Sequence, residues 1–412
     1  MNIAIVGAGL MGRLLTFSLL RHKQLKNLNI TLFDKDNKLA HNSAAYAAAG
    51  LLTPLGESLD CEPNIVEMGF ESLRLWPRLL DRLGVPNLLQ QSGAIMVSHE
   101  QDKGDYQRFV RHINNHYSSH TLQNLDRQEL LALEPDIGRS FNQGVYLPQE
   151  GQVYNRPLLV ALQKAIEQAP SNHDQRSNRC HWLSDCRVIA ISSQQADNIS
   201  AHGYSADKKL STVTYVHKGQ QRSGYFDLVI DCRGTGASPK NNSTPCATLT
   251  DLRAVRGELF HLFAPEVNLT RPLRLMHPRY QLYIAPKQKG YYVVGATEIE
   301  SDDDSPVTVR SALELLSAAY SVHPGFAEAN IVQHLSQCRP AFSDNQPKIS
   351  LQNSLLQVNG LFRHGYLVSP VVLEQTLAVI TNFVNNTDNA LPYSELMPVS
   401  INQNESLHEY FY

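Results

Sequence analysis

The chain has 412 residues, with 36 lysines and arginines against 39 aspartates and glutamates, so its net charge is −3 with histidine counted as neutral. Hydrophobic residues make up 42% and charged residues 18%, an ordinary globular composition that excludes collagen, a coiled coil and a largely disordered chain. The length predicts two or three units, each able to bury a core. A near-neutral chain is not built for nucleic acid, which needs clustered lysine and arginine, and we find no run near the roughly 20 apolar residues of a membrane span.

The amino-terminal segment Met1–Gly7 is apolar enough to suggest a signal peptide. It lacks a basic start, and glycines interrupt it at motif spacing, so we interpret it as a first β-strand and expect a cytoplasmic protein. The cysteines are scattered and form no CxxC pair, so we expect reduced thiols rather than disulfides or a zinc ribbon. They are Cys61, Cys180, Cys186, Cys232, Cys246 and Cys338.

The first elements form a recognisable unit. A β-branched run at Asn2–Val6 predicts a strand, Leu10–Leu20 has helical apolar spacing, and Ile30–Phe33 predicts a second strand. Strand, glycine turn, helix and strand make a βαβ unit. Further along, we expect helices at 64–83, 107–116, 126–134 and 156–168, and strands at 94–98, 188–192, 211–217 and 226–232.

The second half of the chain predicts an antiparallel sheet, because the segments at 256–263, 281–285 and 291–295 alternate or run apolar. A helix is expected at 307–320, and the acidic run Asp302–Asp304 fits its start, where the helix dipole favours carboxylates. A strand at 355–358 and a last helix at 371–385 follow. The polar segments 171–179, 241–245 and 398–412 are expected to be an exposed loop, a linker and a peripheral tail.

The turn after the first strand carries Gly7-x-Gly9-x-x-Gly12. The first glycine allows the tight turn, the second lets backbone approach a pyrophosphate, and the third lets the helix pack closely on the strand. The helix N-terminus that follows offers N–H groups to phosphates. Asp34 ends the second strand, where a carboxylate accepts the ribose hydroxyls. This pattern predicts a dinucleotide site and argues against a 2′-phosphate, but it does not separate FAD from NAD.

Three later segments resemble the D-amino-acid-oxidase superfamily of flavoproteins, and most of all its glycine-oxidase branch. They are the small-residue stretch Ser43–Pro54, the late strand and glycine turn Phe226–Ala237, and the loop Asn359–Pro370 before the last helix. Gly295–Glu298 and Cys338-Arg339-Pro340, with Asp344 and Pro347 beyond, also fit that family. The resemblance covers roughly residues 1–395 in the expected order, and it makes an NAD-only dehydrogenase improbable.

The resemblance implies an α/β fold with an α+β second domain: an FAD-binding Rossmann-type domain plus an antiparallel-sheet substrate domain. We expect the FAD-binding domain to comprise 1–84, 146–250 and 336–397, the substrate or cap domain 85–145 and 251–335, and a peripheral tail 398–412. The implied FAD contacts are Gly7, Gly9, Gly12, Asp34, Lys35, Ser43, Gly50, Leu51, Leu52, Val188, Cys232, Gly234, Arg339, Arg363, Gly365, Tyr366, Leu367 and Val368. Val188 is equally readable as a core valine.

The resemblance also implies three residues for chemistry. Arg339 matches the arginine that clamps the substrate carboxylate with two hydrogen bonds, although an arginine paired with Asp344 is the structural alternative. Tyr283 matches the glycine-oxidase tyrosine that shares this carboxylate, or is a tyrosine on a sheet face. His364 is a proton carrier or a hydrogen-bonded loop histidine. His364 and Gln281 both depart from the usual glycine-oxidase pattern.

His112, His116 and His120 recur every four residues, so on one helix they would share a face as metal ligands can. No glutamate follows the first histidine as in HExxH, and we expect a solvated helix face and no metal. No GxSxG or Walker A motif is present.

The resemblance implies an FAD-dependent oxidoreductase that oxidises an amine or amino acid by hydride transfer, with oxygen as the acceptor. The alternative is a maturase that oxidises a side chain of a precursor protein during biogenesis of a tryptophylquinone-type cofactor. The stretches His277–Tyr280 and Val307–Ser311 look closer to that type. A flavin-bearing binding module without turnover is the third reading. The expected partner is a small substrate or a precursor protein, not nucleic acid or a membrane.

Overall fold

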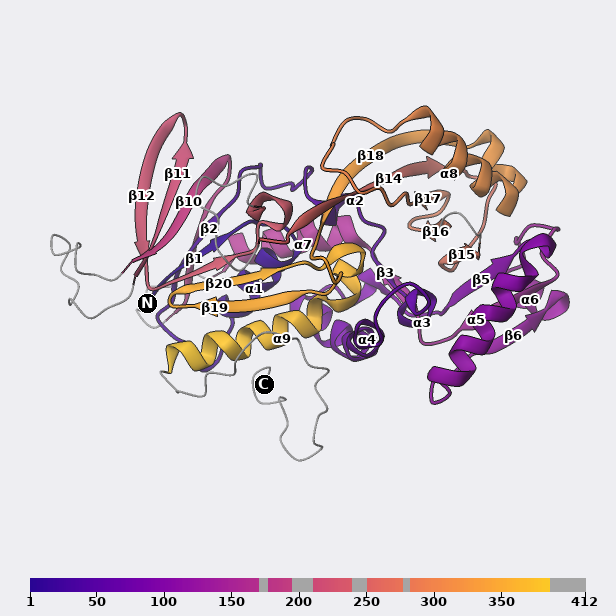
Figure 1. Ribbon diagram of the computed structural model, residues 1–412, viewed down its shortest axis with the longest axis horizontal. Coiled ribbons are helices and arrows are strands. Elements are labelled where there is room, and N and C mark those ends of the chain that lie inside the picture. The colour runs from indigo at the N-terminus through magenta and orange to yellow at the C-terminus, as the bar shows by residue number, and fades with distance from the viewer. Residues whose placement is uncertain (170–176, 195–209, 239–249, 277–281, 386–412) are drawn as a thin grey trace. The chain divides into compact units, whose positions relative to one another are not determined.

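The computed structural model describes residues 1–169, 177–194, 210–238, 250–276 and 282–385. The chain divides into two compact units built from interleaved segments, whose elements are labelled in Figure 1. Unit 1 comprises Met1–Tyr46, Arg156–Arg253 and Arg339–Tyr412. Unit 2 comprises Ala47–Asn155 and Ala254–Cys338. The chain therefore passes from one unit to the other several times.

Unit 1 is built on a six-stranded sheet in the order β19-β20-β13-β1-β2-β9. The strands are β1 (Asn2–Val6), β2 (Asn29–Phe33), β9 (Arg179–Leu183), β13 (Leu228–Asp231), β19 (Lys348–Gln352) and β20 (Leu355–Asn359). All neighbours run parallel except β19 and β20. Because parallel strands are covered on both faces, β1 reads as the continuous apolar run seen in the sequence. The carboxyl ends of β1, β2, β13 and β20 consequently meet at one edge.

Helices α1 (Leu10–Leu20), α7 (Asn155–Glu167) and α9 (Gly365–Val384) accompany this sheet, and α1 packs against α9. A separate antiparallel meander comprises β10 (Cys186–Gln194), β11 (Leu210–His217) and β12 (Gln220–Phe226). Short helical turns lie at η4 (Gly234–Ala237) and η8 (Phe362–His364), and α2 (Ala44–Ala47) lies where unit 1 gives way to unit 2.

Unit 2 is built on an eight-stranded sheet in the order β18-β14-β17-β16-β15-β5-β7-β6. The strands are β5 (Ala94–Ser98), β6 (Gln123–Asp126), β7 (Gln143–Leu147), β14 (Arg253–Phe263), β15 (Leu273–Met276), β16 (Leu282–Pro286), β17 (Tyr291–Gly295) and β18 (Asn330–Ala341). A smaller sheet pairs β3 (Leu51–Leu52), β8 (Gly151–Val153) and β4 (Leu89–Gln90). The helices are α3 (Pro54–Glu57), α4 (Pro63–Leu83), α5 (Lys103–His116), α6 (Arg127–Leu133) and α8 (Val309–Val322), with turns η1 (Pro86–Leu88), η2 (Glu100–Asp102) and η7 (Pro324–Glu328).

The mixed α/β fold is confirmed, and β1, α1, β5 and β17 have the predicted bounds. The expected antiparallel sheet of unit 2 is mixed, because β5 pairs in parallel with β15, whereas β15, β16 and β17 pair antiparallel. The unit boundaries differ from the expected domains: residues 47–84 and 146–155 lie in unit 2. The reason is local pairing, since β3 pairs with β8 in the register Leu51↔Gln152. The predicted loop at 171–179 lies mostly outside the described residues, and 241–245, Gln281 and 398–412 lie wholly outside them.

Two predicted elements need correction. The strand expected at 226–232 is two strands, because Asp227 separates β12 from β13 and its Oδ2 accepts a hydrogen bond from the Asn2 backbone N–H at 2.6 Å. The last helix begins at Gly365 rather than 371 and contains Pro370. The ring nitrogen of Pro370 cannot donate to the Tyr366 carbonyl, and the Ser369 hydroxyl donates to that carbonyl instead at 3.4 Å.

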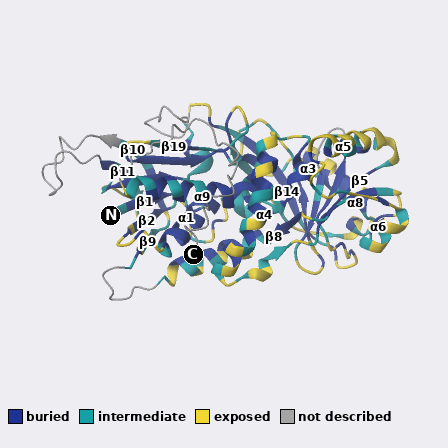
Figure 2. Ribbon diagram, turned by 90° about the horizontal axis from the view of Figure 1, so that it is seen from below, coloured by how far each residue is buried: buried dark blue, intermediate teal, exposed yellow. Residues whose placement is uncertain are grey.

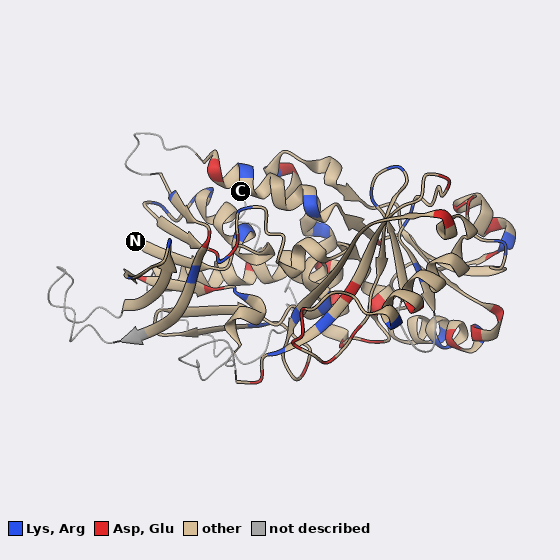
Figure 3. Ribbon diagram, turned by 90° about the horizontal axis from the view of Figure 1, so that it is seen from above, with Lys and Arg blue, Asp and Glu red and all other residues tan. Residues whose placement is uncertain are grey.

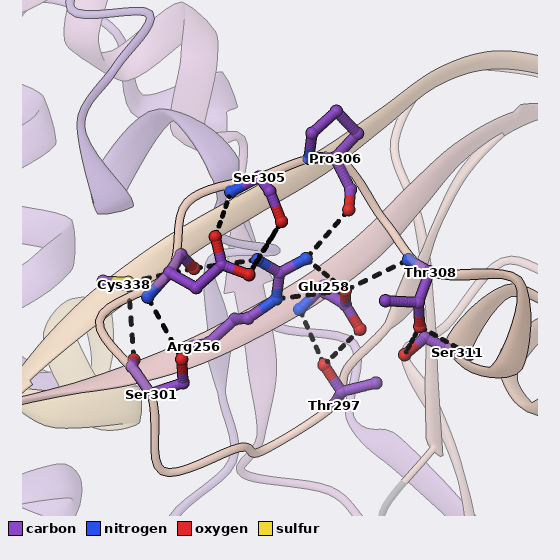
Figure 4. A network of polar contacts seen from close by, with 10 residues as sticks. Arg256, Glu258, Thr297, Ser301, Ser305, Pro306, Thr308, Ser311 and Cys338 are labelled. Atoms are coloured by element: carbon purple, nitrogen blue, oxygen red, sulfur yellow. Dashed lines mark hydrogen bonds and ion pairs between the residues drawn. The ribbon is translucent and has the colours of Figure 1, made fainter.

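The acidic run at 302–304 does not start a helix. Helix α8 begins at Val309, and the Thr308 side chain caps it by accepting from the Ser311 N–H. Asp303 Oδ2 lies instead 3.0 Å from Nη1 of Arg256. Figure 4 shows the polar network around Arg256. Arg256 Nη2 also pairs with Glu258 at 2.6 Å. The run therefore ties the segment before α8 to strand β14.

One segment, Phe362–Val384, is long and apolar enough to cross a membrane by length and composition alone, which the sequence reading did not anticipate. Two-thirds of its window is buried within the protein (67%), as the dark colouring of α9 in Figure 2 indicates. Lysines and arginines are interspersed with aspartates and glutamates along the described chain (Figure 3). Among the described residues, five cysteines are outside any disulfide: Cys61, Cys180, Cys186, Cys232 and Cys338.

Candidate functional site

The glycine turn after β1 shows which glycines the protein needs for its own packing. Gly7 has φ +99°, and a Cβ there would lie 2.7 Å from the Cys232 carbonyl oxygen. A Cβ on Gly12 would overlap the Gly7 carbonyl oxygen. A Cβ on Gly9, in contrast, would meet no protein atom within 4 Å. Gly9 therefore keeps space open where a ligand approaches the backbone.

Helix α1 begins at this turn, with Gly9 as its N-cap and no side chain capping it. Its first turn contains no acidic residue. Exposed N–H groups and the positive end of the helix dipole suit an anion at this end. The open Gly9 and the uncapped helix together fit a dinucleotide pyrophosphate.

Asp34 follows β2 and lies beside the turn. Its Oδ2 accepts a hydrogen bond from the Ala8 N–H, and its Oδ1 accepts from the Asp36 N–H at 2.8 Å. Burial raises the pKa of Asp34, while these backbone hydrogen bonds oppose the rise. The side chain is thus held at the β2 carboxyl end, where a ribose is bound in dinucleotide folds. The neighbouring Lys35 is exposed.

Arg13 is a residue that the sequence reading missed. It is 1% exposed, and its guanidinium donates to three carbonyls: Ala8 at 2.7 Å, Leu159 at 2.8 Å and Lys38 at 2.7 Å. Burial lowers its pKa to about 10, and the charge of Asp34 opposes that change. One buried cation therefore joins the glycine turn, α7 and the segment after β2. No sequence pattern signalled this, because its acceptors are backbone atoms.

Two more predicted segments reach the same edge of the unit 1 sheet. Cys232 follows β13, and its N–H donates to the Val6 carbonyl at 2.8 Å. Gly234 has φ +58°, and its carbonyl accepts from the Asn359 side chain at 3.0 Å. Asn359 ends β20, so the turns after β1, β2, β13 and β20 lie at one end of the sheet.

The loop after β20 leads directly into α9. Gly365 begins that helix, and Tyr366, Leu367 and Val368 are buried in its first turns. The Tyr366 hydroxyl donates to the Ala45 carbonyl at 3.0 Å, and burial raises the pKa of Tyr366. The helix start is therefore tied to the stretch that begins at Ser43.

The side chains of η8 occupy different surroundings. His364 is buried, with its ring 5.9 Å from that of Phe362 in an edge-on contact. The Arg363 guanidinium lies 5.8 Å from the same phenyl ring.

Val188 pairs with Tyr215 in the meander and belongs to a core cluster that includes Phe33. These contacts leave the predicted roles of His364, Arg363 and Val188 as predictions.

In unit 2, Tyr283 lies on β16 opposite Gly295 of β17. A Cβ on Gly295 would lie 2.7 Å from the Tyr283 hydroxyl, so the glycine makes room for that ring. Tyr283 packs against an apolar cluster of Ala47, Ala49, Leu259, Ala285 and Val293, as do Leu51 and Leu335. Two separately predicted features, the small-residue stretch and the tyrosine, therefore pack in the same cluster.

Arg339 lies in β18, where the chain passes from unit 2 to unit 1. Its structural alternative was a pair with Asp344, and the Asp344 carboxylate lies 3.2 Å from Lys348 Nζ. The preceding residue, Cys338, places its Sγ 3.7 Å from the Ser301 carbonyl oxygen. The role of Arg339 itself remains a prediction.

The histidine series does not share one helix face. His112 and His116 are on α5 with ring centroids 4.9 Å apart, but the helix ends at His116. His120 stacks on Phe70 with centroids 3.6 Å apart. Among the described residues, no group of three histidine, cysteine or acidic side chains is arranged to hold a metal.

A buried acidic cluster in unit 2 was also missed by the sequence reading. Arg274 Nη2 pairs with Glu57 at 2.6 Å, and Glu150 Oε1 accepts from the Gly56 N–H at 2.9 Å. Burial raises the pKa of Glu150 to about 8, despite hydrogen bonds from Gly56 and the charge of Arg274. Glu150 therefore holds a proton at neutral pH.

We expect Glu150 to make folding stability depend on pH. A carboxyl whose folded pKa is raised binds more proton in the folded chain, so stability falls as pH rises from its unfolded pKa to about 8. Between pH 6 and pH 9 the free energy of unfolding should fall by about 3 kcal/mol from this group. Glu150→Gln keeps an acceptor for Gly56 and should remove that loss in urea unfolding. The exposed control Glu266→Gln should retain it; an equal loss in both variants would contradict the assignment.

The fold and the site define a class: a two-unit protein whose α/β unit is built to bind a dinucleotide. A family model described as FAD dependent oxidoreductase (DAO) matches residues 2–374. The chain belongs to this family, and its cofactor is FAD. FAD supplies a hydride acceptor when bound.

Individual relatives agree with this membership. A proposed thiamine biosynthesis oxidoreductase, ThiO, of Rhizobium etli is 30% identical over 372 residues, covering 90% of this chain and 94% of the relative. Glycine oxidase of Geobacillus kaustophilus is 24% identical, and the match covers 97% of this chain and 96% of that protein. The crystal structure of glycine oxidase from Geobacillus kaustophilus has a TM-score of 0.72 at 22% identity and covers 98% of this chain and 99% of that one. That structural likeness concerns the fold.

Proposed function

We propose that this protein oxidises an amine or amino acid by a glycine-oxidase-like reaction, with oxygen as the acceptor. The observation that carries the proposal is that Tyr283 packs against the apolar cluster that contains Ala47 and Ala49, because the resemblance assigns the substrate to the tyrosine and the flavin to the small-residue stretch. The similar proteins named as glycine oxidase and ThiO support the same substrate class.

In this proposal the protein contributes binding and orientation. Arg339 holds the substrate carboxylate through a two-pronged hydrogen bond, and the Tyr283 hydroxyl shares that carboxylate. His364 acts from the flavin loop as a hydrogen-bonding or proton-carrying group. The amine reacts in its neutral form, so no strong protein base is required.

The FAD contacts proposed in unit 1 are Gly7, Gly9, Gly12, Asp34, Lys35, Ser43, Val188, Cys232, Gly234, Arg339, Arg363, Gly365, Tyr366, Leu367 and Val368. Those proposed in unit 2 are Gly50, Leu51 and Leu52. The cytoplasm is the proposed compartment, supported by five cysteines of the described residues that stand as thiols outside any disulfide.

The test is an anaerobic absorbance titration of the FAD-loaded protein with glycine, sarcosine and a panel of D-amino acids. Bleaching of the flavin band by one of them identifies the substrate class. Admission of air should then restore the band if oxygen is the acceptor. A band that none of these compounds bleaches contradicts the proposal and favours the precursor-protein substrate of a maturase.

A further inference from the structure

Lys287 follows strand β16 and places its ammonium group against the small-residue stretch. Its Nζ donates to the Ala49 carbonyl and to Gln152 Oε1, the latter at 2.6 Å. The Tyr154 ring lies 5.8 Å from the same nitrogen. The backbone N–H of Lys287 donates to the Tyr291 carbonyl at 2.9 Å, which fixes the start of the hairpin turn.

Gln152 is completely buried and has one orientation available. Its Nε2 donates to the Pro286 carbonyl and to Gln90 Oε1, so its Oε1 is directed at Lys287. Gln152 also pairs with Leu51 between β8 and β3. Lys287 is therefore hydrogen-bonded to Ala49, which precedes Gly50, and to Gln152, which pairs with Leu51.

Lys287 shares a strand face with the proposed substrate tyrosine. Tyr283, Ala285 and Lys287 are alternate residues, and alternate residues of a strand point to one face. Tyr283 and Ala285 both pack in the cluster with Ala49. The lysine therefore bonds to the backbone carbonyl of Ala49, while Tyr283 and Ala285 pack in the cluster that contains Ala49.

The charge of Lys287 has no acidic counterpart among the described residues, and its contacts there are a carbonyl, an amide and a ring. Burial lowers the pKa of Lys287 to about 7. Buried cations are usually paired with a carboxylate, because desolvating an unpaired charge costs free energy. Lys287 is half-buried, and a lysine that no carboxylate of the described residues neutralises, beside a cofactor stretch, calls for a functional explanation.

We propose that Lys287 is a positioning residue for FAD: it holds the Ala49 carbonyl, and with it the Gly50–Leu52 backbone, and it supplies a positive charge that favours the reduced cofactor. The inference rests on the proposed function, which assigns Gly50, Leu51 and Leu52 to FAD. A cation near a cofactor that gains negative charge on reduction raises its potential.

The deciding variant is Lys287→Gln, which keeps a donor for Ala49 and removes the charge. All variants are compared at pH 6, below the pKa of Lys287, where the wild-type side chain carries its proton. We expect it to bind FAD with a lower midpoint potential and with an affinity for sulfite, which bleaches electron-poor flavins, about tenfold weaker, the size of a partly screened charge interaction of about 1.4 kcal/mol. Lys287→Arg restores the charge and should recover both values. The matched control Lys289→Gln, an exposed lysine on the same hairpin, should leave both unchanged.

Wild-type potential and sulfite affinity in Lys287→Gln would overturn the inference, as would equal changes in Lys289→Gln. Neither readout uses an amine substrate. A lowered potential in Lys287→Gln, with no amine bleaching the wild-type protein, would leave the inference standing and reject the proposed function. An unchanged potential in Lys287→Gln, together with bleaching of the wild-type flavin by an amine, would reject the inference and leave the proposed function standing.

Discussion

Replacing Gly9 by alanine is expected to weaken FAD binding about 100-fold, equivalent to about 2.7 kcal/mol, while lowering apoprotein stability by no more than about 1 kcal/mol, the cost of alanine in place of glycine at an N-cap. The backbone of Gly9 has φ −71°, which alanine adopts without strain. The new methyl group would meet no protein atom within 4 Å. The steric clash of this methyl group is therefore expected only in the FAD-bound protein, where the pyrophosphate approaches the turn. FAD affinity by fluorescence quenching and apoprotein unfolding in urea measure the two effects separately.

Gly12→Ala is the contrasting change, because its methyl group would overlap the Gly7 carbonyl oxygen. Helix α1 would have to move away from β1, so both apoprotein stability and FAD affinity should fall. Gly104→Ala is the matched control, since a Cβ on this exposed glycine of α5 also meets no atom within 4 Å. It should leave FAD affinity unchanged, and it should not lower apoprotein stability, because alanine is the better helix former. Unchanged FAD affinity in Gly9→Ala would show that the cofactor does not approach this turn.

The sequence predicts this turn well because its constraints are local. Gly7, Gly12 and Asp34 are within one βαβ unit, and each satisfies a steric or hydrogen-bonding need of that unit. The convergence of the turns after β13 and β20 could be predicted only through the family resemblance. Nothing in the spacing of Cys232 and Asn359 indicates that β13 lies between β1 and β20.

The buried charges could not be predicted from the sequence, for a physical reason. Arg13 bonds to Leu159, 146 positions away, and Lys287 bonds to Ala49, 238 positions away. Their acceptors are carbonyls, which every residue type carries, so no residue pattern marks them. The acidic run before α8 was misread for a related reason: its partner Arg256 lies on a strand 47 positions earlier than Asp303. An argument from the helix dipole considers only the adjacent helix, so it could not identify Arg256 as the partner.

Replacing Arg339 is expected to have the largest effect on turnover. Removing one member of a buried, hydrogen-bonded charge pair costs about 2–5 kcal/mol, so Arg339→Met should lower kcat/KM for an amino acid by about 100- to 1000-fold. Arg339→Lys keeps the charge but cannot form the two-pronged bond, and should recover only part of the loss. The rate of anaerobic flavin bleaching against substrate concentration separates the loss of binding from the loss of rate.

The control is Arg222→Met, an exposed arginine on β12 in unit 1, which should bleach at the wild-type rate. FAD content must be measured in each variant, because loss of the cofactor in Arg339→Met would indicate a structural role in β18.

A comparison of two substrates tests the clamp directly. A simple amine lacks the carboxylate that Arg339 is proposed to clamp, so its oxidation should be affected much less. Equal losses for an amino acid and for the corresponding amine would therefore reject the clamp even if the variant is inactive.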